Sequence, residues 1–336
     1  MPETHELRVA VLGVGRMGAH HAAILATLVK GVRVQVVNDV STDRAHEVAE
    51  GIPGARVVAD PFEAIEADDI DAVVIATPGA AHEKQLLACL DRQLPVLCEK
   101  PLTVESSTAY AIVTRQASVG RDLIQVGFMR RFDREYVHLR EAIASGALGV
   151  PLMVHCTHRN PGVPDTATTE SVINDSAVHE VDAVRFLLGE EIRSVMVVRG
   201  RPSARAPKAL NDPLLLVFET ESGAVVTDEL FVSSGIAYEV RTEVVGERGI
   251  ATIGLDQSMV TKTPGGRWGG QSAPSFIERF GAAYDMELRR WVNAARRGSV
   301  DGPGAWDGYA AAAVCEAAVT ALRTGERVDV VLAARP

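Results

Sequence analysis

Residues 9–18 have the sequence VAVLGVGRMG, a short apolar run followed by three glycines in the pattern Gly-x-Gly-x-x-Gly. The apolar run predicts a buried strand, and the residues after the glycines predict the start of a helix. Glycines permit the tight turn and let a pyrophosphate approach the backbone, where the first helical N–H groups have no partner. The segment therefore predicts a parallel α/β domain that binds a dinucleotide.

The choice of dinucleotide depends on the next strand, which we expect at residues 32–38. That strand ends just before Asp39, about 20 residues beyond the last glycine, where a carboxylate accepts hydrogen bonds from ribose hydroxyls. A carboxylate repels a 2′-phosphate, so NAD is favoured over NADP. Arg44 follows closely and can screen a phosphate, which leaves some use of NADP open.

The first third of the chain alternates between apolar, β-rich runs and helical segments. The runs that we expect to form strands are residues 8–12, 32–38, 71–77, 96–98 and 123–127. Such alternation predicts a Rossmann-type parallel sheet with helices on both faces, here over residues 1–128. A connecting segment, residues 129–149, contains a predicted helix at 134–144 that ends before Gly146.

A different pattern begins at residue 150 and predicts an α+β domain over residues 150–336. One helix, at about 176–188, precedes a series of strands that would form an open, largely antiparallel sheet. The expected strands are residues 194–200, 214–220, 224–232, 240–246, 251–253 and 327–331. Two long helices, at about 273–297 and 306–324, are candidates to pack back on the first domain. Residues 201–213 and 263–274 are predicted loops, and the second, with Trp268, is a candidate mobile segment near a site.

Composition excludes several classes of function. The net charge of −10 among 336 residues offers no basic surface for nucleic acid or an anionic membrane. The four cysteines are widely spaced, and no two of them form a Cys-x-x-Cys pair. Such a distribution is typical of core residues in a protein of the reducing cytosol. The N-terminus lacks the pattern of a secretory signal, so we expect a cytoplasmic protein.

Residues 174–182, NDSAVHEVD, place Asp175, His179 and Asp182 at positions i, i+4 and i+7. On an α-helix these positions share one face, and a histidine between carboxylates is a ready proton acceptor near neutral pH. Three structural alternatives stay open: Asp175 capping the helix, Asp182 exposed and paired with Arg185, and His179 as a core residue. A metal site is a fourth, but the chain lacks His-Glu-x-x-His and paired cysteines, so we expect none.

Residues 98–101, CEKP, follow the strand at 96–98 and place Lys100 at its carboxyl end, where open α/β sheets bind their ligands. Pro101 makes a cis bond possible, which would aim the lysine into that crevice. A Lys-Pro pair alone is more often a turn with a solvated lysine.

Taken together, these segments resemble the glucose-fructose oxidoreductase, inositol dehydrogenase and rhizopine-catabolism family, and most of all its inositol 2-dehydrogenase branch. The resemblance covers almost the whole chain. It rests on the glycine turn, on Glu99-Lys100-Pro101 and on residues 125–133 (QVGFMRRFD), 158–161 (HRNP), 175–182, 243–247 (EVVGE) after Tyr238, and 306–309 (WDGY). The resemblance implies a homotetramer formed through sheet faces and a cyclic polyol or sugar bound between the domains.

The resemblance also implies roles for individual residues. Lys100, Asp175 and His179 would be catalytic: His179 the base, Lys100 the donor to the reacting oxygen, and Asp175 the residue that orients the histidine. The cofactor would contact Gly13, Gly15, Arg16, Met17, Gly18, Asp39, Thr77, Pro78, Glu99 and Lys100. The substrate would contact Lys100, Arg130, His158, Asn160, Asp175, His179, Asp182 and Tyr238. His158 and Asn160 as backbone-bonded loop residues, and Tyr238 at a sheet edge or an oligomer contact, stay open as alternatives.

The implied activity is the NAD-dependent oxidation of a ring hydroxyl, most nearly that of myo-inositol to 2-keto-myo-inositol. Other activities of the same fold stay open: oxidation of scyllo-inositol, chiro-inositol, an aldose or an anhydrosugar, or glycoside cleavage through a transient oxidation. A protein that senses NAD without turnover would be expected to lack the lysine and the histidine, and both are present.

Overall fold

The computed structural model describes residues 6–255, 261–264, 266–268 and 272–336, without the side chains of 261–263 and 266–268. The chain divides into two compact units. Unit 1 comprises Met1–Phe132, Ala282–Ala312 and Ala333–Pro336, and unit 2 comprises Asp133–Gly281 and Ala313–Leu332. The long helices α9 (Phe276–Ala295) and α10 (Ala305–Thr324) therefore each contribute to both units.

Unit 1 is built on a parallel sheet in the order β3-β2-β1-β4-β5-β6. Its strands are β1 (Leu7–Leu12), β2 (Val32–Asn38), β3 (Arg56–Val58), β4 (Ala72–Ile75), β5 (Val96–Cys98) and β6 (Ile124–Val126). The order reverses between β1 and β4, as in dinucleotide-binding Rossmann domains, so the predicted fold class is confirmed. The prediction missed β3, whose three residues include two that are only half-buried.

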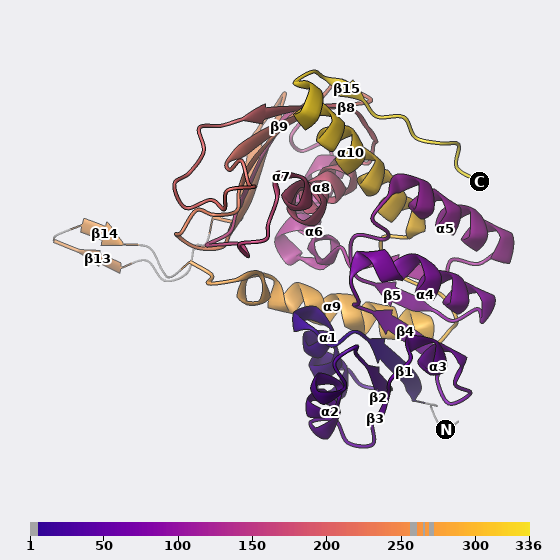
Figure 1. Cartoon of the computed structure of the whole chain (residues 1–336). Helices are drawn as coiled ribbons and strands as arrows, with labels where there is room; N and C mark the ends of the chain where they lie inside the picture. Colours follow the sequence, from indigo (N-terminus) through magenta and orange to yellow (C-terminus); the bar gives the residue numbers. More distant parts are fainter. Residues whose placement is uncertain (1–5, 256–260, 265, 269–271) are drawn as a thin grey trace. The chain divides into compact units, whose positions relative to one another are not determined.

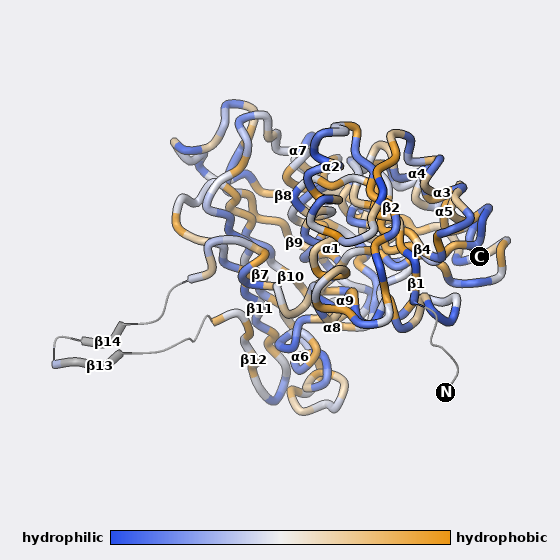
Figure 2. The backbone as a smooth tube through the Cα atoms, turned by 90° about the horizontal axis from the view of Figure 1, so that it is seen from below, coloured by the Kyte–Doolittle hydropathy of each residue, from blue (hydrophilic) through white to orange (hydrophobic). Residues whose placement is uncertain are grey.

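Helices cover both faces of this sheet because the crossovers share one hand while the strand order reverses between β1 and β4. These helices are α1 (Arg16–Thr27), α2 (Thr42–Glu50), α3 (Pro61–Glu66), α4 (Gly79–Asp91) and α5 (Ser106–Val119). Figure 1 shows α4 and α5 side by side, apart from α1 and α2. Figure 2 shows β4 in orange, because its four residues are apolar and buried, as expected of a strand covered on both faces.

The edge of the sheet at β6 is covered by the segment that leads into α10. The N–H of Val126 donates to the carbonyl of Pro303 at 2.8 Å, and Gln125 forms an antiparallel bridge with Gly304. Edge strands present unpaired backbone groups, and this segment satisfies part of them.

Unit 2 contains a seven-stranded sheet in the order β12-β11-β7-β10-β9-β8-β15. Its strands are β7 (Pro151–Arg159), β8 (Ile192–Arg199), β9 (Leu214–Thr220), β10 (Val225–Phe231), β11 (Glu239–Gly246), β12 (Ile250–Ile253) and β15 (Val328–Asp329). Only the β7–β10 pair is parallel, so the expected open, largely antiparallel sheet is confirmed.

The prediction omitted β7, which lies in the interior of the sheet between β10 and β11. Its sequence, PLMVHCTHR, alternates poorly: Leu152 and Met153 are both exposed, while the polar His158 is buried. Part of the predicted loop at 263–274 is also a hairpin of β13 (Thr261–Thr263) and β14 (Gly266–Trp268). The side chain of Trp268 lies outside the described residues.

One face of the unit 2 sheet is covered by helices, among them α6 (Arg134–Ala144), α7 (Thr169–Val172) and α8 (Val178–Leu188), which lie close together in Figure 1. The bounds of α6 match the prediction. The helix expected from residue 176 is part of a longer helical segment, which begins at Thr169 and includes a π-helical turn, η2 (Ile173–Ala177), before α8. A π-turn hydrogen-bonds from i to i+5, and no residue pattern in the sequence indicates one.

Asp212 fixes the chain where it leaves β10. Its buried carboxylate accepts the N–H of Val232 at 3.1 Å and the N–H of Ser233 at 2.8 Å, as well as the Ser233 hydroxyl. The next residue, Ser234, donates its N–H and its hydroxyl to the carbonyl of Asn160 at 3.0 and 2.8 Å. Asp212 thereby supports the backbone that holds a candidate substrate residue.

Replacing Asp212 by alanine should lower the free energy of unfolding of unit 2 by about 3 kcal/mol, because two buried N–H groups lose their acceptor. Guanidinium denaturation followed by circular dichroism measures the change. The exposed Asp165 provides the control, since Asp165→Ala should stay within about 0.5 kcal/mol of the wild type. Equal stabilities of the two variants would contradict the role of Asp212.

Candidate functional site

The three glycines after β1 have different structural roles. A Cβ on Gly18 would lie 1.8 Å from the carbonyl oxygen of Gly13, and a Cβ on Gly13 would lie 2.7 Å from that of Ala76. Gly13 also has φ +78°, which disfavours other residues. A Cβ on Gly15, in contrast, would meet nothing within 4 Å. Gly13 and Gly18 are therefore required by packing, whereas Gly15 leaves open space beside the start of α1.

Two helix N-termini at this edge of the sheet lack a side-chain cap. Helix α1 begins after Gly15 with Arg16 and Met17 and has no acidic residue in its first turn. Helix α4 begins after Thr77 and Pro78 at the end of β4, the neighbour of β1. Uncapped N–H groups and the positive end of the helix dipole attract an anion. Together with the space beside Gly15, they fit the pyrophosphate of a dinucleotide.

Asp39 is held rigidly at the end of β2. Its carboxylate is 7% exposed and accepts the N–H of Val14 at 2.8 Å and the N–H of Ser41 at 2.9 Å. Each carboxylate oxygen can accept a further hydrogen bond, so these contacts leave capacity for ribose hydroxyls. A guanidinium nitrogen of Arg44 lies 3.6 Å from the same carboxylate, on a side chain that is half exposed. The residues of unit 1 therefore fit NAD.

Glu99 and Lys100 follow β5, and the Lys100–Pro101 peptide bond is cis. Lys100 is half-buried, whereas Glu99 is buried and accepts two hydrogen bonds: from His21 Nε2 at 2.7 Å and from the Lys100 N–H at 3.2 Å. Burial alone would raise the pKa of Glu99, but the bond from His21 and the positive charges nearby hold that pKa below its usual value. Glu99 is therefore a carboxylate with two protein partners. Sequence reasoning missed His21 because no spacing rule links it to Glu99.

Thr77 is engaged by the helix that follows it. Its hydroxyl donates to Gln85 Oε1 at 2.7 Å, and its carbonyl oxygen lies 2.8 Å from His82 Nε2. Pro78 is exposed beside it. The backbone entering α4 is thereby fixed.

In unit 2, the Asp-His-Asp stripe is not a uniform helix face. Asp175 is exposed in the π-turn, whereas His179 is 9% exposed and Asp182 only 1%. The segment is capped by Thr168, so Asp175 is not its N-cap. Asp182 does face Arg185, at 4.0 Å, but both side chains are buried, so the alternative of a solvated surface pair is wrong.

His158 lies at the centre of a buried polar group in unit 2. Its Nδ1 is 3.0 Å from Glu180 Oε2 and its Nε2 is 3.1 Å from Asn160 Oδ1. The ring of Tyr238 meets it edge-on at 5.8 Å, and the ring of His179 lies 6.5 Å away. The structure thus brings together four of the predicted substrate residues and adds Glu180, which sequence reasoning missed.

The structure contradicts the loop alternative for His158 and the sheet-edge alternative for Tyr238. Asn160 follows β7 and does hydrogen-bond through its backbone, while its side chain contacts His158. His158 lies in β7 rather than in a loop, and its ring bonds to side chains. Tyr238 is 5% exposed and also packs edge-on against Phe276 and Phe280, so it is a core residue of unit 2. Arg130, in the 3₁₀ turn η1 (Met129–Phe132), belongs to unit 1 with Lys100 and is 2% exposed.

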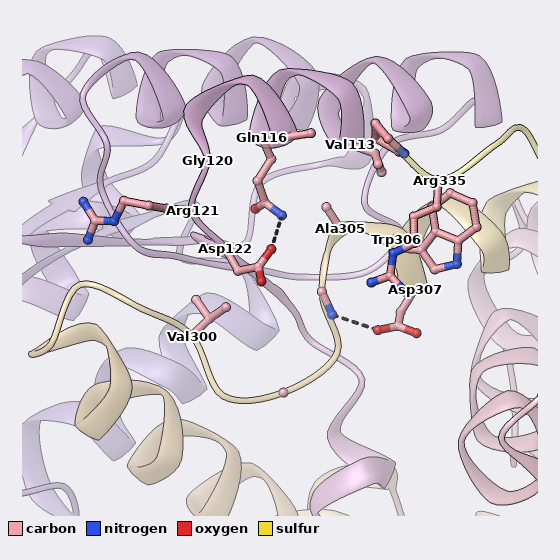
Figure 3. A pocket seen from close by; sticks show the side chains of 14 residues that line it. Val113, Gln116, Gly120, Arg121, Asp122, Val300, Ala305, Trp306, Asp307 and Arg335 are labelled. Carbon is pink, nitrogen blue, oxygen red and sulfur yellow. Dashed lines mark hydrogen bonds between the residues drawn. The ribbon is translucent and has the colours of Figure 1, made fainter.

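Unit 1 also contains a cavity of about 500 Å³ between the C-terminal half of α5, residues 300–307 and Arg335 (Figure 3). Its polar groups bond to one another: Gln116 donates to Asp122 at 3.1 Å, and the Gly304 N–H donates to Asp307 at 2.9 Å. None of the predicted cofactor or substrate residues lines this cavity.

The described residues contain neither a metal-binding cluster nor a membrane-spanning helix. No group of three or more His, Cys, Asp or Glu side chains is arranged to hold a metal ion there. No helix in the described ranges is long and apolar enough to cross a membrane. All four cysteines are buried, as predicted for core residues.

Comparison with known proteins identifies the class of the chain. Residues 7–128 match the oxidoreductase family with an NAD-binding Rossmann fold, and residues 140–330 match the C-terminal alpha/beta domain of that family. These matches cover most of the chain. The protein belongs to the glucose-fructose oxidoreductase, inositol dehydrogenase and rhizopine-catabolism family.

Individual relatives are similar over their full lengths. An inositol 2-dehydrogenase of Rhodococcus erythropolis is 56% identical over 340 aligned residues, with 100% of this chain and 98% of that protein covered. Inositol 2-dehydrogenase 2 of Mycolicibacterium vanbaalenii is 55% identical, with 98% and 97% covered. Among solved structures, the myo-inositol dehydrogenase of Lactobacillus casei in complex with NAD(H) and myo-inositol has a TM-score of 0.94 and 32% identity, with 98% of each chain covered.

The glycine turn provides a test that separates folding from cofactor binding. Gly15→Ala should change the free energy of unfolding by less than about 1 kcal/mol, because its Cβ meets no protein atom. It should nevertheless raise the Kd for NAD by about tenfold or more, since the methyl group occupies the space assigned to the pyrophosphate. Nucleotide titration and thermal unfolding measure the two effects.

Gly18→Ala is the matched control, and it should destabilise unit 1 by roughly 1–3 kcal/mol because its Cβ overlaps the Gly13 carbonyl. Unchanged NAD affinity in Gly15→Ala would place the pyrophosphate elsewhere.

Proposed function

We propose that this protein is an NAD-dependent inositol 2-dehydrogenase that oxidises myo-inositol to 2-keto-myo-inositol. Whole-chain similarity to inositol 2-dehydrogenases carries the proposal. The uncapped helix ends and the rigid Asp39 of unit 1 support the cofactor assignment. We assign residues 1–128 to cofactor binding and residues 150–336 to substrate binding and oligomerisation.

His179 is the proposed base. Oxidation of an alcohol removes a hydride from carbon and a proton from the hydroxyl, and bound NAD would supply the hydride acceptor. An imidazole is suited to accept the proton because histidine titrates near neutral pH. His179 lies in the first turn of α8, and its burial restricts the ring to few orientations. Asp175, one turn earlier, is the proposed orienting carboxylate.

Lys100 is the proposed donor to the reacting oxygen. As the proton leaves, negative charge develops on that oxygen, and an ammonium group stabilises it more strongly than a neutral donor. Lys100 follows β5 and so lies at the carboxyl ends of the parallel strands. The proposed cofactor residues Thr77 and Pro78 follow the adjacent strand, β4. Lys100 is also the residue of unit 1 that we assign to both cofactor and substrate.

Recognition of the polyol requires several fixed polar groups, because a wrong epimer then leaves buried partners unpaired. Three residues of unit 2 are fixed polar groups of this kind. The side chains of Asp182 and His158 are buried, and the side chain of Asn160 is hydrogen-bonded to His158. Tyr238 and Arg130 complete the proposed set.

The Asp39 carboxylate favours NAD over NADP, and the acidic net charge and scattered cysteines support a cytoplasmic location.

Lys100→Ala and His179→Ala should each abolish NADH formation from myo-inositol and NAD while leaving the Kd for NAD within about threefold. The measurement is absorbance at the NADH band with a panel of inositols, pyranoses and anhydrosugars, with NAD and NADP in parallel. Lys84→Ala and His138→Ala, both exposed, are matched controls that should keep full activity. A wild type inactive on every polyol would reject the proposed function, and an active Lys100 or His179 variant would reject the proposed roles.

We also propose that the protein is a homotetramer. The face of the unit 2 sheet opposite its buried side exposes apolar side chains on four neighbouring strands: Met153 beside Val225, and Val198 beside Leu215 with Met196 one step along the same strand. An apolar sheet face of this kind is typical of a protein interface.

Leu215→Glu should therefore convert the tetramer to smaller species in light scattering coupled to size exclusion, because a charge would be buried at the interface. Leu28→Glu, at an exposed apolar residue after α1, should leave the assembly unchanged. A monomeric wild type would reject this assembly.

A further inference from the structure

We propose that His21 is a positioning residue for Lys100, acting through the carboxylate of Glu99. The inference rests on the proposed function, in which Lys100 holds the reacting oxygen. His21 lies on α1, the helix that begins at the cofactor turn, whereas Lys100 follows β5. The histidine is separated from the lysine by a long stretch of sequence, and β1 and β5 are not neighbours in the sheet.

The connection between them is a pair of hydrogen bonds to one carboxylate. His21 Nε2 lies 2.7 Å from Glu99 Oε1, and the N–H of Lys100 donates to Glu99 Oε2 at 3.2 Å. His21 is fully buried and Glu99 is 8% exposed, so water does not compete freely for either bond. In such surroundings a charged acceptor makes strong, directional bonds.

The backbone and its neighbours leave Glu99 little freedom. Its own N–H donates to the Ile75 carbonyl at 2.8 Å, and the Gly127 N–H donates to the Cys98 carbonyl at 2.7 Å. A Cβ on Gly127 would lie 3.2 Å from the Glu99 carboxyl group, so the absence of a side chain at 127 makes room for it. The carboxylate therefore fills a site bounded by the ends of β4, β5 and β6, and His21 closes that site from α1.

Among the described residues, the His21 ring makes no other hydrogen bond that would explain its burial. Its Nδ1 has no hydrogen-bond partner within the part of the chain that the structure describes. The ring otherwise meets Tyr284 of α9 edge-on, with centroids 5.9 Å apart. Burying an imidazole nitrogen without a partner carries a cost, and the Glu99 bond is the polar contact that offsets it.

Loss of His21 would free Glu99 to turn toward other donors, of which the Lys100 ammonium is the nearest in sequence. A carboxylate that pairs with that ammonium would draw it away from the substrate oxygen. Misplacement of a catalytic group by about 1 Å can cost about 100-fold in rate. The expected defect is thus in the chemical step and not in cofactor binding.

The test compares three variants for kcat and KM with myo-inositol and for the Kd of NADH by fluorescence. His21→Leu keeps a similar volume but removes the donor, and kcat should fall by about 100-fold with the Kd within about twofold. His21→Gln places an amide N–H where Nε2 lies and should recover kcat to within about tenfold of the wild type. His20→Leu removes the neighbouring imidazole, whose ring meets Tyr284 edge-on while His21 makes the bond to Glu99, and should leave kcat unchanged.

A crystal structure of His21→Leu makes the result independent of the proposed function, because it should show Glu99 rotated and Lys100 displaced whether or not a polyol is turned over. Unmoved Lys100, equal loss of kcat in His21→Gln and His21→Leu, or a rise in Kd that matches the fall in kcat would overturn the inference. If His21→Leu does not fold, His21→Asn, too short to reach Glu99, replaces it. Failure of both to fold would assign His21 to stability and overturn the positioning role.

Discussion

The reversal of strand order between β1 and β4 is the constraint on which unit 1 depends. Strands added on either side of that point place their helices on opposite faces, so α1 and α4 begin at adjacent strand ends with no helix covering them. Neither start has a side-chain cap, and Gly15 leaves the space beside α1 open. The anion site is therefore a product of topology, and the glycines only permit it.

Two buried carboxylate–histidine pairs hold the residues around the candidate site in place. Glu99 is paired with His21 in unit 1, and Glu180 is paired with His158 in unit 2, where the two side chains are 1% and 4% exposed. Removing one partner of such a pair costs more than the pair contributes, because the other charge stays buried. These pairs therefore restrict the positions of neighbouring groups, which a dehydrogenase needs more than it needs added stability.

The sequence pattern predicted those features of the fold that depend on residues close together in the chain. The glycine turn, the acid after β2, the helix bounds of α6 and the alternation of strand and helix follow from spacing and turn chemistry within about 30 residues. The resemblance of short motifs then supplied the residues of unit 2. The strand β7 was missed because its inward positions carry Cys156 and His158 rather than an unbroken apolar row. Polar residues that a site requires weaken the signal by which a strand is recognised.

The π-turn before α8 is a second place where the local sequence pattern does not predict the structure. An ideal α-helix through residues 175–182 would put both aspartates and His179 on one stripe, yet the structure exposes Asp175 and buries the other two. The wider i to i+5 turn shifts the residues before Val178 relative to the face of α8. Such turns are rare within α-helices and are frequent at functional sites. The proposed orienting carboxylate, Asp175, and the proposed base, His179, therefore differ in exposure although they lie in the same helical segment.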